Sequence, residues 1–546
     1  MKGIRLPGVD KELCISQYAD DNTLFCSDEE SVNIALGFID IFSILSGLYL
    51  NWNKTEGIWI GNWKYKRKKI GRFKWNLGIG SRLKILGVTF ANNESAGNIA
   101  ENWESRINNI EKLANIWVKR NLSMCGRIII VKSLMLSKLT HLLSVFTMPE
   151  KLRQKVDSIM FRFIWNLKGK TGERVKRDVV IQAYECGGLK MATVEIMQKA
   201  CILSTLTTFL KVEQLYTAIP RWLMKLFCSK LESWTKLNTM IGGLKPVEKI
   251  TYLPRIYKCV IEEFLNLKGI DNNVSKFDLI WNNENVKYKD KVLYFKSWID
   301  AGLMHLEQVL DNEGKMLPYD TLYQHVPQRG GFMIEYNVLL NALRGVNVDM
   351  SRDEIVRTIE GRRWKDFQVK NFRDLLTKRK FEEPNVQVHW NSKFPDCDLN
   401  WPSIWDCCSH LKMEARILTL QWKILHNVYP TNVLLKRMGK SDTDMCRACN
   451  DLETVQHFFG ESCIKVKSLW KHIDRFISVT NNERIRLTDV DILFGYKVQN
   501  VEKHIEINRL ILLGKLCISK FKYGKHANLL LLFEQECRLR NIDLSF

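Results

Sequence analysis

Two neighbouring carboxylates near the start of the chain, Asp20 and Asp21, are the first side chains whose type and spacing could do chemistry. Carboxylates held side by side repel each other, and Mg²⁺, which prefers oxygen ligands, relieves that repulsion. Residues 13–18 and 23–26 flank the pair, so the pattern predicts a strand, a tight turn at 20–22 and a second strand. An Asp-Asp turn taken alone is most often a solvated loop, so the surrounding sequence must decide.

Four thiol and imidazole side chains near the other end of the chain form a second candidate metal site. Cys446, Cys449, His457 and Cys463 stand in a C-x₂-C-x₇-H-x₅-C pattern. Thiolates two residues apart can bind one metal from a tight knuckle, and a later His and Cys can complete the tetrahedron. Zinc is the usual metal for three sulfurs and one imidazole. The alternative is two exposed thiols, a surface histidine and a packed cysteine.

The formal net charge of +22 indicates a polyanionic partner, because each neutralised phosphate releases condensed counterions. The alternative is a basic protein whose charge only keeps it dispersed. No run approaches the roughly 20 apolar residues that span a bilayer, and the N-terminus has no apolar stretch typical of a secretory signal. We therefore expect no membrane partner and an intracellular protein of the nucleus or cytoplasm, with reduced thiols.

The stretch from Trp63 to Lys84, called the basic stretch below, combines basic and aromatic side chains. It contains no acidic residue, and its basic residues are Lys64, Lys66, Arg67, Lys68, Lys69, Arg72, Lys74, Arg82 and Lys84. Between them stand Trp63, Tyr65, Phe73 and Trp75. Cations can meet phosphates while aromatic faces stack on bases or sugars, so we expect nucleic-acid contacts, from Lys66, Arg67 and Lys68 in particular. A basic surface loop is the alternative.

The elements that position these residues follow from capping signals and periodicity. Ser27 begins a capping box before an amphipathic helix that stops at Gly47, and residues 48–51 then resemble a strand. From about residue 98 to 146 apolar side chains recur at spacings of three and four, which predicts helices. Ser123 is expected to cap the second of them.

These residues resemble those of a known family. Residues 16–25, Ser-Gln-Tyr-Ala-Asp-Asp-Asn-Thr-Leu-Phe, are similar to palm motif C of the reverse transcriptases of LINE-type (non-LTR) retrotransposons, which are right-hand polymerases. Residues 46–55 resemble motif D, and residues 84–88, Lys-Ile-Leu-Gly-Val, resemble the hairpin that grips the primer. The Leu-Ser-x-x-Gly-Arg stretch at 122–127 resembles the start of the family's thumb. The motifs occur in the family's order and approximate spacing.

The resemblance implies that Asp20 and Asp21 bind catalytic Mg²⁺, with Tyr18 and Lys54 beside them in the active site. It also implies contacts with an RNA template and a DNA primer or target, made by Leu86, Gly87, Arg127 and Lys132. For Arg127 and Lys132 solvated charges are an equally good interpretation.

Catalysis in the family needs a third carboxylate from a separate upstream strand. Asp10 and Glu12 lie in the approach to the hairpin and cannot provide it. We therefore expect a chain truncated within the palm, a fragment of an RNA-directed DNA polymerase that acts in target-primed reverse transcription when whole and is inactive alone. The alternative is a non-catalytic RNA- or DNA-binding zinc protein derived from a retroelement.

The expected fold is α+β and predominantly α. Its parts are a partial palm at 1–95, a helical thumb and basic linker at 96–205, a helical connecting region of unassigned role at 206–400, and a helical zinc-knuckle module at 401–546. Such a module ends many LINE polymerases, which favours zinc. The family more often has four residues between the histidine and the last cysteine, whereas this chain has five, which leaves the role of Cys463 open.

Overall fold

In the computed structural model the chain divides into two compact units. Unit 1 comprises Met1–Arg106, Leu139–Glu150 and Glu195–Asp374; unit 2 comprises Ile107–Lys138, Lys151–Val194 and Leu375–Phe546. The structure describes residues 1–5, 12–94, 98–166, 172–210, 259, 263, 274–276, 280–281, 283, 285–326, 330–350, 358–359, 362–363, 366–406, 411, 413–523 and 528–542. Helices predominate there and every sheet has two strands, which confirms the α+β, mainly helical class. The polymerase subdomain names and the four domain boundaries stay predictions.

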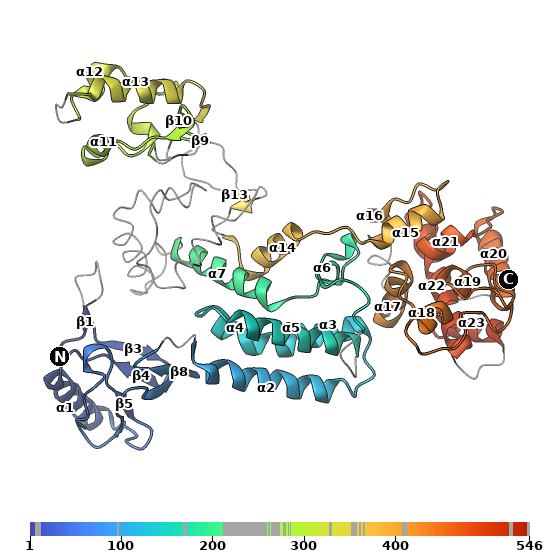
Figure 1. The fold of residues 1–546 in the computed structure, drawn as a ribbon, viewed down its shortest axis with the longest axis horizontal. Helices are drawn as coiled ribbons and strands as arrows, with labels where there is room; N and C mark the ends of the chain where they lie inside the picture. The colour runs from blue at the N-terminus through green and yellow to red at the C-terminus, as the bar shows by residue number, and fades with distance from the viewer. Residues whose placement is uncertain are drawn as a thin grey trace. The chain divides into compact units, whose positions relative to one another are not determined.

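The N-terminal part of unit 1, drawn in blue in Figure 1, consists of short strand pairs and one long helix. Three pairs are antiparallel: β1 (Ile4–Arg5) with β2 (Glu12–Leu13), β3 (Ile15–Tyr18) with β4 (Asp21–Leu24), and β7 (Arg82–Ile85) with β8 (Val88–Ala91). The parallel pair is β5 (Glu56–Ile58) with β6 (Lys74–Asn76). Helix α1 spans Glu29–Ser46, and a 3₁₀ turn covers Gly61–Trp63.

Helix α1 shows where the sequence expectations hold and where they fail. Its N-cap is Asp28, whose side chain accepts a 2.7 Å hydrogen bond from the Ser31 N–H, so the predicted cap at Ser27 is wrong by one residue. The helix ends at Gly47 as predicted, with φ of 72° there. The strand expected at residues 48–51 does not form. Asn51 instead starts a turn, because its carbonyl accepts from the Lys54 N–H at 3.0 Å.

The helices predicted between residues 98 and 146 are present. They are α2 (Ala100–Trp117), α3 (Met124–Ile130), a π-helical turn (Val131–Met135) and α4 (Ser137–Leu143). Trp103, Ile107 and Ile110 of α2 are buried, which confirms the amphipathic pattern. Ser123 caps α3 as expected, since its hydroxyl accepts from the Gly126 N–H at 3.1 Å.

The later part of unit 1 corresponds to most of the predicted connecting region. Its helices are α7 (Val194–Leu210), α11 (Lys296–Asp300), α12 (Tyr319–Tyr323) and α13 (Phe332–Leu343), with a 3₁₀ turn at Leu306–Gln308. Its strand pairs are β10 (Lys287–Tyr288) with β11 (Lys291–Val292), β9 (Val274–Ser275) with β12 (Val348–Asp349), and β13 (Thr358–Ile359) with β14 (Arg362–Arg363). Trp298 stacks on Phe332 at 5.0 Å between ring centroids and anchors this core. The described residues thus mix short helices with strand pairs.

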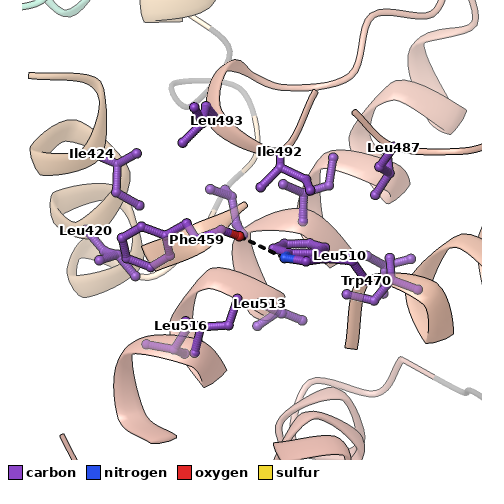
Figure 2. Close-up of a cluster of buried hydrophobic side chains, with 14 of the residues drawn as sticks. Leu420, Ile424, Phe459, Trp470, Leu487, Ile492, Leu493, Leu510, Leu513 and Leu516 are labelled. Atoms are coloured by element: carbon purple, nitrogen blue, oxygen red, sulfur yellow. Dashed lines mark hydrogen bonds between the residues drawn. The ribbon is translucent and has the colours of Figure 1, made fainter. Parts of the chain in front are cut away.

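Unit 2 is helical. After α3 come α5 (Glu150–Trp165), α6 (Arg177–Val180), η4 (Tyr184–Cys186), α14 (Val369–Arg379), α15 (Val386–Lys393), α16 (Trp401–Asp406), α17 (Ala415–Leu425), α18 (Asn432–Arg437), α19 (Val455–Phe459), α20 (Ile464–Asn481), α21 (Asp489–Phe494), α22 (Val501–Tyr523) and α23 (Leu529–Arg538). A large core lies at the C-terminal end, and Figure 2 shows Trp470 within it, donating its indole N–H to the Phe459 carbonyl at 2.8 Å.

Helices α20 and α22 pack closely against each other in that core. A Cβ placed on Gly514 of α22 would lie 3.0 Å from the Trp470 ring, so only glycine lets α22 pack this tightly on the indole. Among the helices that the structure describes, none is both long enough and apolar enough to cross a bilayer.

Candidate metal centre and nucleic-acid contacts

The β3–β4 hairpin presents the acidic pair at its tip. Tyr18 pairs with Asp21, so Ala19 and Asp20 form a two-residue turn and Asp21 opens β4. The turn therefore begins one residue earlier than the expected 20–22. Ala19 has a φ of +53°, a conformation that glycine normally takes at the first position of a hairpin turn. Both aspartates are exposed and Tyr18 is 68% exposed, so the turn can receive a cation or a substrate.

The acidic pair supplies two carboxylates to a candidate Mg²⁺ site. Within the described part of the chain, no third acidic, His or Cys side chain joins Asp20 and Asp21 in a metal-sized group. Glu12 instead accepts from the Gly3 N–H at 2.9 Å and from Arg5 Nε at 3.1 Å, and these bonds lower its pKa. Asp10 lies outside the described residues. Asp20 and Asp21 alone can hold Mg²⁺ only loosely.

The structure places Lys54 and the second hairpin in exposed turns. Lys54 is exposed in the turn that starts at Asn51. Ile85 pairs with Val88, so Leu86 and Gly87 form the β7–β8 turn, with φ of 46° and 77°. Two positive φ values are typical of the type I′ turn that suits a hairpin. Leu86 is 45% exposed, which leaves this turn free to touch a ligand.

Acidic side chains from neighbouring elements neutralise part of the basic stretch. Glu29 pairs with both Lys66 and Lys68, and Lys66 also lies 4.1 Å from the Trp63 ring centroid. Glu56 pairs with Lys74 at 2.8 Å, and Glu101 pairs with Arg82. Five residues of the stretch pair with no carboxylate of the described chain: Lys64, Arg67, Lys69, Arg72 and Lys84. Of the three cations singled out from the sequence, Arg67 is therefore the best placed for a phosphate.

Two of the four aromatic side chains of the stretch, Phe73 and Trp75, build a small core with Trp59. Trp59 stacks on Trp75 with ring centroids 4.5 Å apart, and Phe73 lies 5.3 Å from Trp75. Trp75 also donates its indole N–H to the Ile70 carbonyl at 2.7 Å. Tyr65, 64% exposed, keeps a face on which a base could stack. Trp63 is 40% exposed, but Trp59 and Lys66 both lie against its ring.

Arg127 and Lys132, the two cations predicted to lie in a thumb, lie in helical surroundings. Arg127 is half-buried on α3, donates from Nη1 to the Ile164 carbonyl at 3.2 Å, and has its pKa lowered by burial. Lys132 is half-buried in the π-helical turn. Both side chains are partly shielded from solvent, and their contact with a phosphate stays a prediction.

The structure brings the four predicted zinc ligands together. One ligand atom from each of Cys446, Cys449, His457 and Cys463 lies within 4.8 Å of the other three. Cys449 Sγ lies 3.7 Å from Cys463 Sγ, close to the edge of about 3.8 Å that two sulfurs 2.3 Å from a tetrahedral Zn²⁺ would span. The His457 Nε2 atom is buried and has no hydrogen-bond partner among the described residues, so its lone pair is available to bind a metal. The donor set therefore fits Zn²⁺ at a closed structural site.

Local structure fixes each of these ligands. A bridge between Met445 and Leu452 turns the chain back on itself and forms the knuckle that carries Cys446 and Cys449. His457 lies on α19, whose N-cap Thr454 accepts from the His457 N–H at 3.2 Å.

Cys463, the fourth predicted ligand, reaches the cluster although five residues, one more than is usual in the family, separate it from His457. Cys463 is the N-cap of α20 and fully buried, so the fifth intervening residue does not displace it from the cluster. That loop ends in Ser462, whose hydroxyl lies 3.5 Å from His457 Nδ1 and can orient the ring.

Backbone donors and a buried lysine set the charge of the site. Burial opposes ionisation of the Cys446 thiol, but the N–H groups of Ala448 and Cys449 outweigh it and hold its pKa below the usual range. Burial raises the pKa of Cys463 to about 11 and, with Lys522, lowers the pKa of His457. Without metal the thiols are thus unequally acidic, so metal binding must release protons.

Lys522 of α22 lies beside the site and was not predicted from the sequence. Its ammonium lies 3.7 Å from the Phe458 ring centroid and 3.9 Å from Glu453 Oε2. Three thiolates and an imidazole on Zn²⁺ carry a net charge of −1, which a buried cation complements. Lys522 lies a long stretch of chain after Cys463, the last of the four predicted ligands, so no local spacing could have indicated it. His426, by contrast, is a packed residue, buried with Nε2 2.7 Å from the Gly187 carbonyl.

Comparisons with known proteins add one distant relative. No protein-family model matches the chain. The chain is similar to an Arabidopsis thaliana protein named "Putative ribonuclease H protein", with 27% identity over 116 residues. The match covers 20% of this chain and 17% of the relative. The chain thus spans only a small part of a relative whose name places it among the enzymes of nucleic acids.

Proposed function

We propose that the chain is part of a LINE-type reverse transcriptase and binds RNA and DNA. The observation that carries the proposal is the exposed hairpin that presents Tyr18, Asp20 and Asp21 at its tip. A second exposed turn at Leu86–Gly87 and the unpaired cations of the basic stretch support it, because both suit contact with a nucleic-acid backbone. The similarity to a protein named for ribonuclease H points to the same class of partner.

In this proposal Asp20 and Asp21 hold Mg²⁺ ions, which activate the primer 3′-hydroxyl and stabilise the leaving pyrophosphate. Tyr18 lies beside them on the last position of β3, where its exposed ring can pack against the primer end. Catalysis also requires a third carboxylate, which the described residues do not bring to the hairpin. Binding of primer and template is therefore separable from polymerisation.

We further propose that Cys446, Cys449, His457 and Cys463 bind one Zn²⁺. The metal joins the knuckle, α19 and the start of α20, so its role is structural. It would thereby hold the C-terminal module in the shape that contacts nucleic acid.

Binding and primer extension, measured on the purified full chain with zinc, test the proposal. A labelled primer–template should bind, with a Kd that weakens at least about tenfold between low and physiological salt. Absence of binding, or binding insensitive to salt, would contradict it. Extension of the primer that Asp20→Ala abolishes would show that the chain also polymerises.

A second candidate function is a nucleic-acid-binding zinc protein without polymerase activity. The presence of only two carboxylates at the hairpin, within the described residues, favours it. Binding that survives Asp20→Ala, without primer extension by either protein, is the outcome that this candidate expects.

A further inference from the structure

Three cations from separate segments of unit 2 gather without forming an ion pair to any acidic side chain of the described residues. Arg127 lies on α3, Arg174 precedes α6, and Lys423 lies on α17. All three are half-buried. The Val428 carbonyl accepts from Arg174, and the Val428 N–H donates to the Lys423 carbonyl at 2.9 Å, so Val428, which Arg174 contacts, belongs to the same turn as Lys423. Arg127 binds the carbonyl of Ile164, whose neighbour Trp165 lies 6.1 Å from the ring of Trp422, the residue before Lys423. Burial, and after it the charges of Arg174 and Arg127, lower the pKa of Lys423. Bringing like charges together in partly buried surroundings costs free energy, so a compensating partner is expected.

Within the described residues that partner is not a protein carboxylate. None of the three cations forms an ion pair there, and Glu173, the nearest acid in sequence, is engaged by Arg177 at 2.6 Å. Burial lowers the pKa of Arg127 and of Arg174, and no acidic group offsets this for either of them.

Backbone carbonyls hold the two guanidinium groups in place but leave donors unused. Arg127 donates from Nη1 to the Ile164 carbonyl, and Arg174 donates from Nη1 to the Val428 carbonyl, each at 3.2 Å. Arg127 Nε is buried without an acceptor, and so is the indole N–H of Trp165, the residue after Ile164. The cluster therefore has both excess positive charge and excess hydrogen-bond donors.

The elements that carry the cluster are packed firmly together. The rings of Trp165 and Trp422 lie 6.1 Å apart, next to Ile164 and Lys423 in the sequence. Thr419 of α17 lies 3.4 Å from the Cys125 thiol of α3, and Trp422 donates to the Gly187 carbonyl at 2.9 Å. The cations are thus held in place before any ligand arrives, which lowers the entropic cost of binding.

We infer that Arg127, Arg174 and Lys423 form a binding site for a backbone phosphate of RNA or DNA. A phosphodiester has one negative charge and several acceptor oxygens, which match a surplus of cations and N–H donors. The net charge of +22 favours nucleic acid as the source of that phosphate over an acidic peptide. The inference rests on the proposed nucleic-acid binding and names the residues of unit 2 that take part in it.

The salt dependence of binding tests the site. The full zinc-loaded chain, Lys423→Gln, Arg174→Gln and the double variant are titrated with a labelled single-stranded oligonucleotide of mixed sequence over a range of salt concentrations. Each single variant should reduce the slope of log Kobs against log salt by about 0.7, the value for one single-strand phosphate contact. Arg416→Gln is the matched control, since it removes the same charge from an exposed position of the same helix.

Thermal unfolding separates this role from a structural one. Lys423→Gln is the variant for this comparison, because Arg174→Gln also removes the hydrogen bond to the Val428 carbonyl. Removing the Lys423 charge from two neighbouring cations should leave the Tm unchanged or raise it, whereas loss of a structural contact lowers it. If the wild type binds but the cluster variants keep its slope, or change it no more than Arg416→Gln does, the phosphate site is wrong while the proposed function stands. If the wild type does not bind at all, both are wrong.

Discussion

The two candidate metal sites of this chain differ in what lies behind their ligands. The aspartates of the β3–β4 hairpin stand on a two-stranded sheet and are exposed. The four Cys and His ligands of unit 2 stand on the knuckle and on α19 and α20, next to the core around Trp470. The first site can be recognised by its sequence but its side chains are not held by packing, whereas Cys446 and Cys463 of the second site belong to a buried core. A sequence motif therefore indicates where a metal site could lie, and packing around its side chains is separate evidence that they are held in place.

Loss of the proposed zinc should give the largest change in stability. Cys446→Ser removes one of four ligands, so we expect loss of bound zinc and destabilisation of unit 2 by several kcal/mol, roughly 3 or more. Metal analysis together with thermal unfolding measures both. Asp20→Asn is the counterpart at the other site and should change stability by less than about 0.5 kcal/mol, as is usual for an exposed residue. A chain that keeps its Tm after Cys446→Ser would remove the contrast between the sites.

The second-largest difference in stability should come from replacing one large side chain by alanine in each region. Trp470→Ala empties a fully buried indole site and should cost about 3–5 kcal/mol. Phe38→Ala on α1, where the ring is 63% exposed, should cost under about 1 kcal/mol. Urea unfolding of both variants gives the comparison, and equal losses would show that α1 is buried against something in solution.

Acidification should weaken unit 2 through His426. Burial lowers the pKa of its imidazole from 6.5 to about 4. Below pH 6.5 the unfolded chain takes up a proton that the folded chain refuses, so stability present above pH 6.5 is lost as the pH falls toward 4. The full loss is about 3 kcal/mol, because one pKa unit corresponds to about 1.4 kcal/mol.

The measurement for His426 is the free energy of unfolding at several pH values between 7 and 4. His426→Gln removes the titrating ring and should flatten that profile, whatever its effect at pH 7. A variant with the same slope as the wild type would assign the loss to other groups.

A substitution at the tip of the β3–β4 hairpin should give a small change in stability. Ala19 adopts a positive φ, which costs an L-residue about 1 kcal/mol, so Ala19→Gly should stabilise the hairpin by roughly 0.5–1 kcal/mol. Hydrogen exchange of the β3 and β4 amides is the sensitive probe. Faster exchange in the variant would mean that the turn is not strained.

Local signals explain what the sequence predicted well. The stop at Gly47, the cap at Ser123 and the β7–β8 turn each depend on a few consecutive residues. The cysteine spacing likewise predicted a cluster that the structure brings together.

Contacts between distant segments explain what the sequence did not predict. Glu29 neutralises Lys66 and Lys68 from another element, so the stretch without acidic residues is less basic in the fold than in the sequence. Lys522 of α22 lies against Phe458 and Glu453 beside the cysteine cluster, and the charge of Arg127 on α3 influences Lys423 on α17. Such pairings depend on tertiary structure alone.

The packing of α17 on α3 also has a consequence for the timing of synthesis. Thr419 meets Cys125 across a separation of 294 residues. At about 5–20 residues per second a ribosome needs roughly 15–60 s to make that much chain. During this interval the face of α3 that α17 later covers waits without its partner, exposed to chaperones and to other nascent chains.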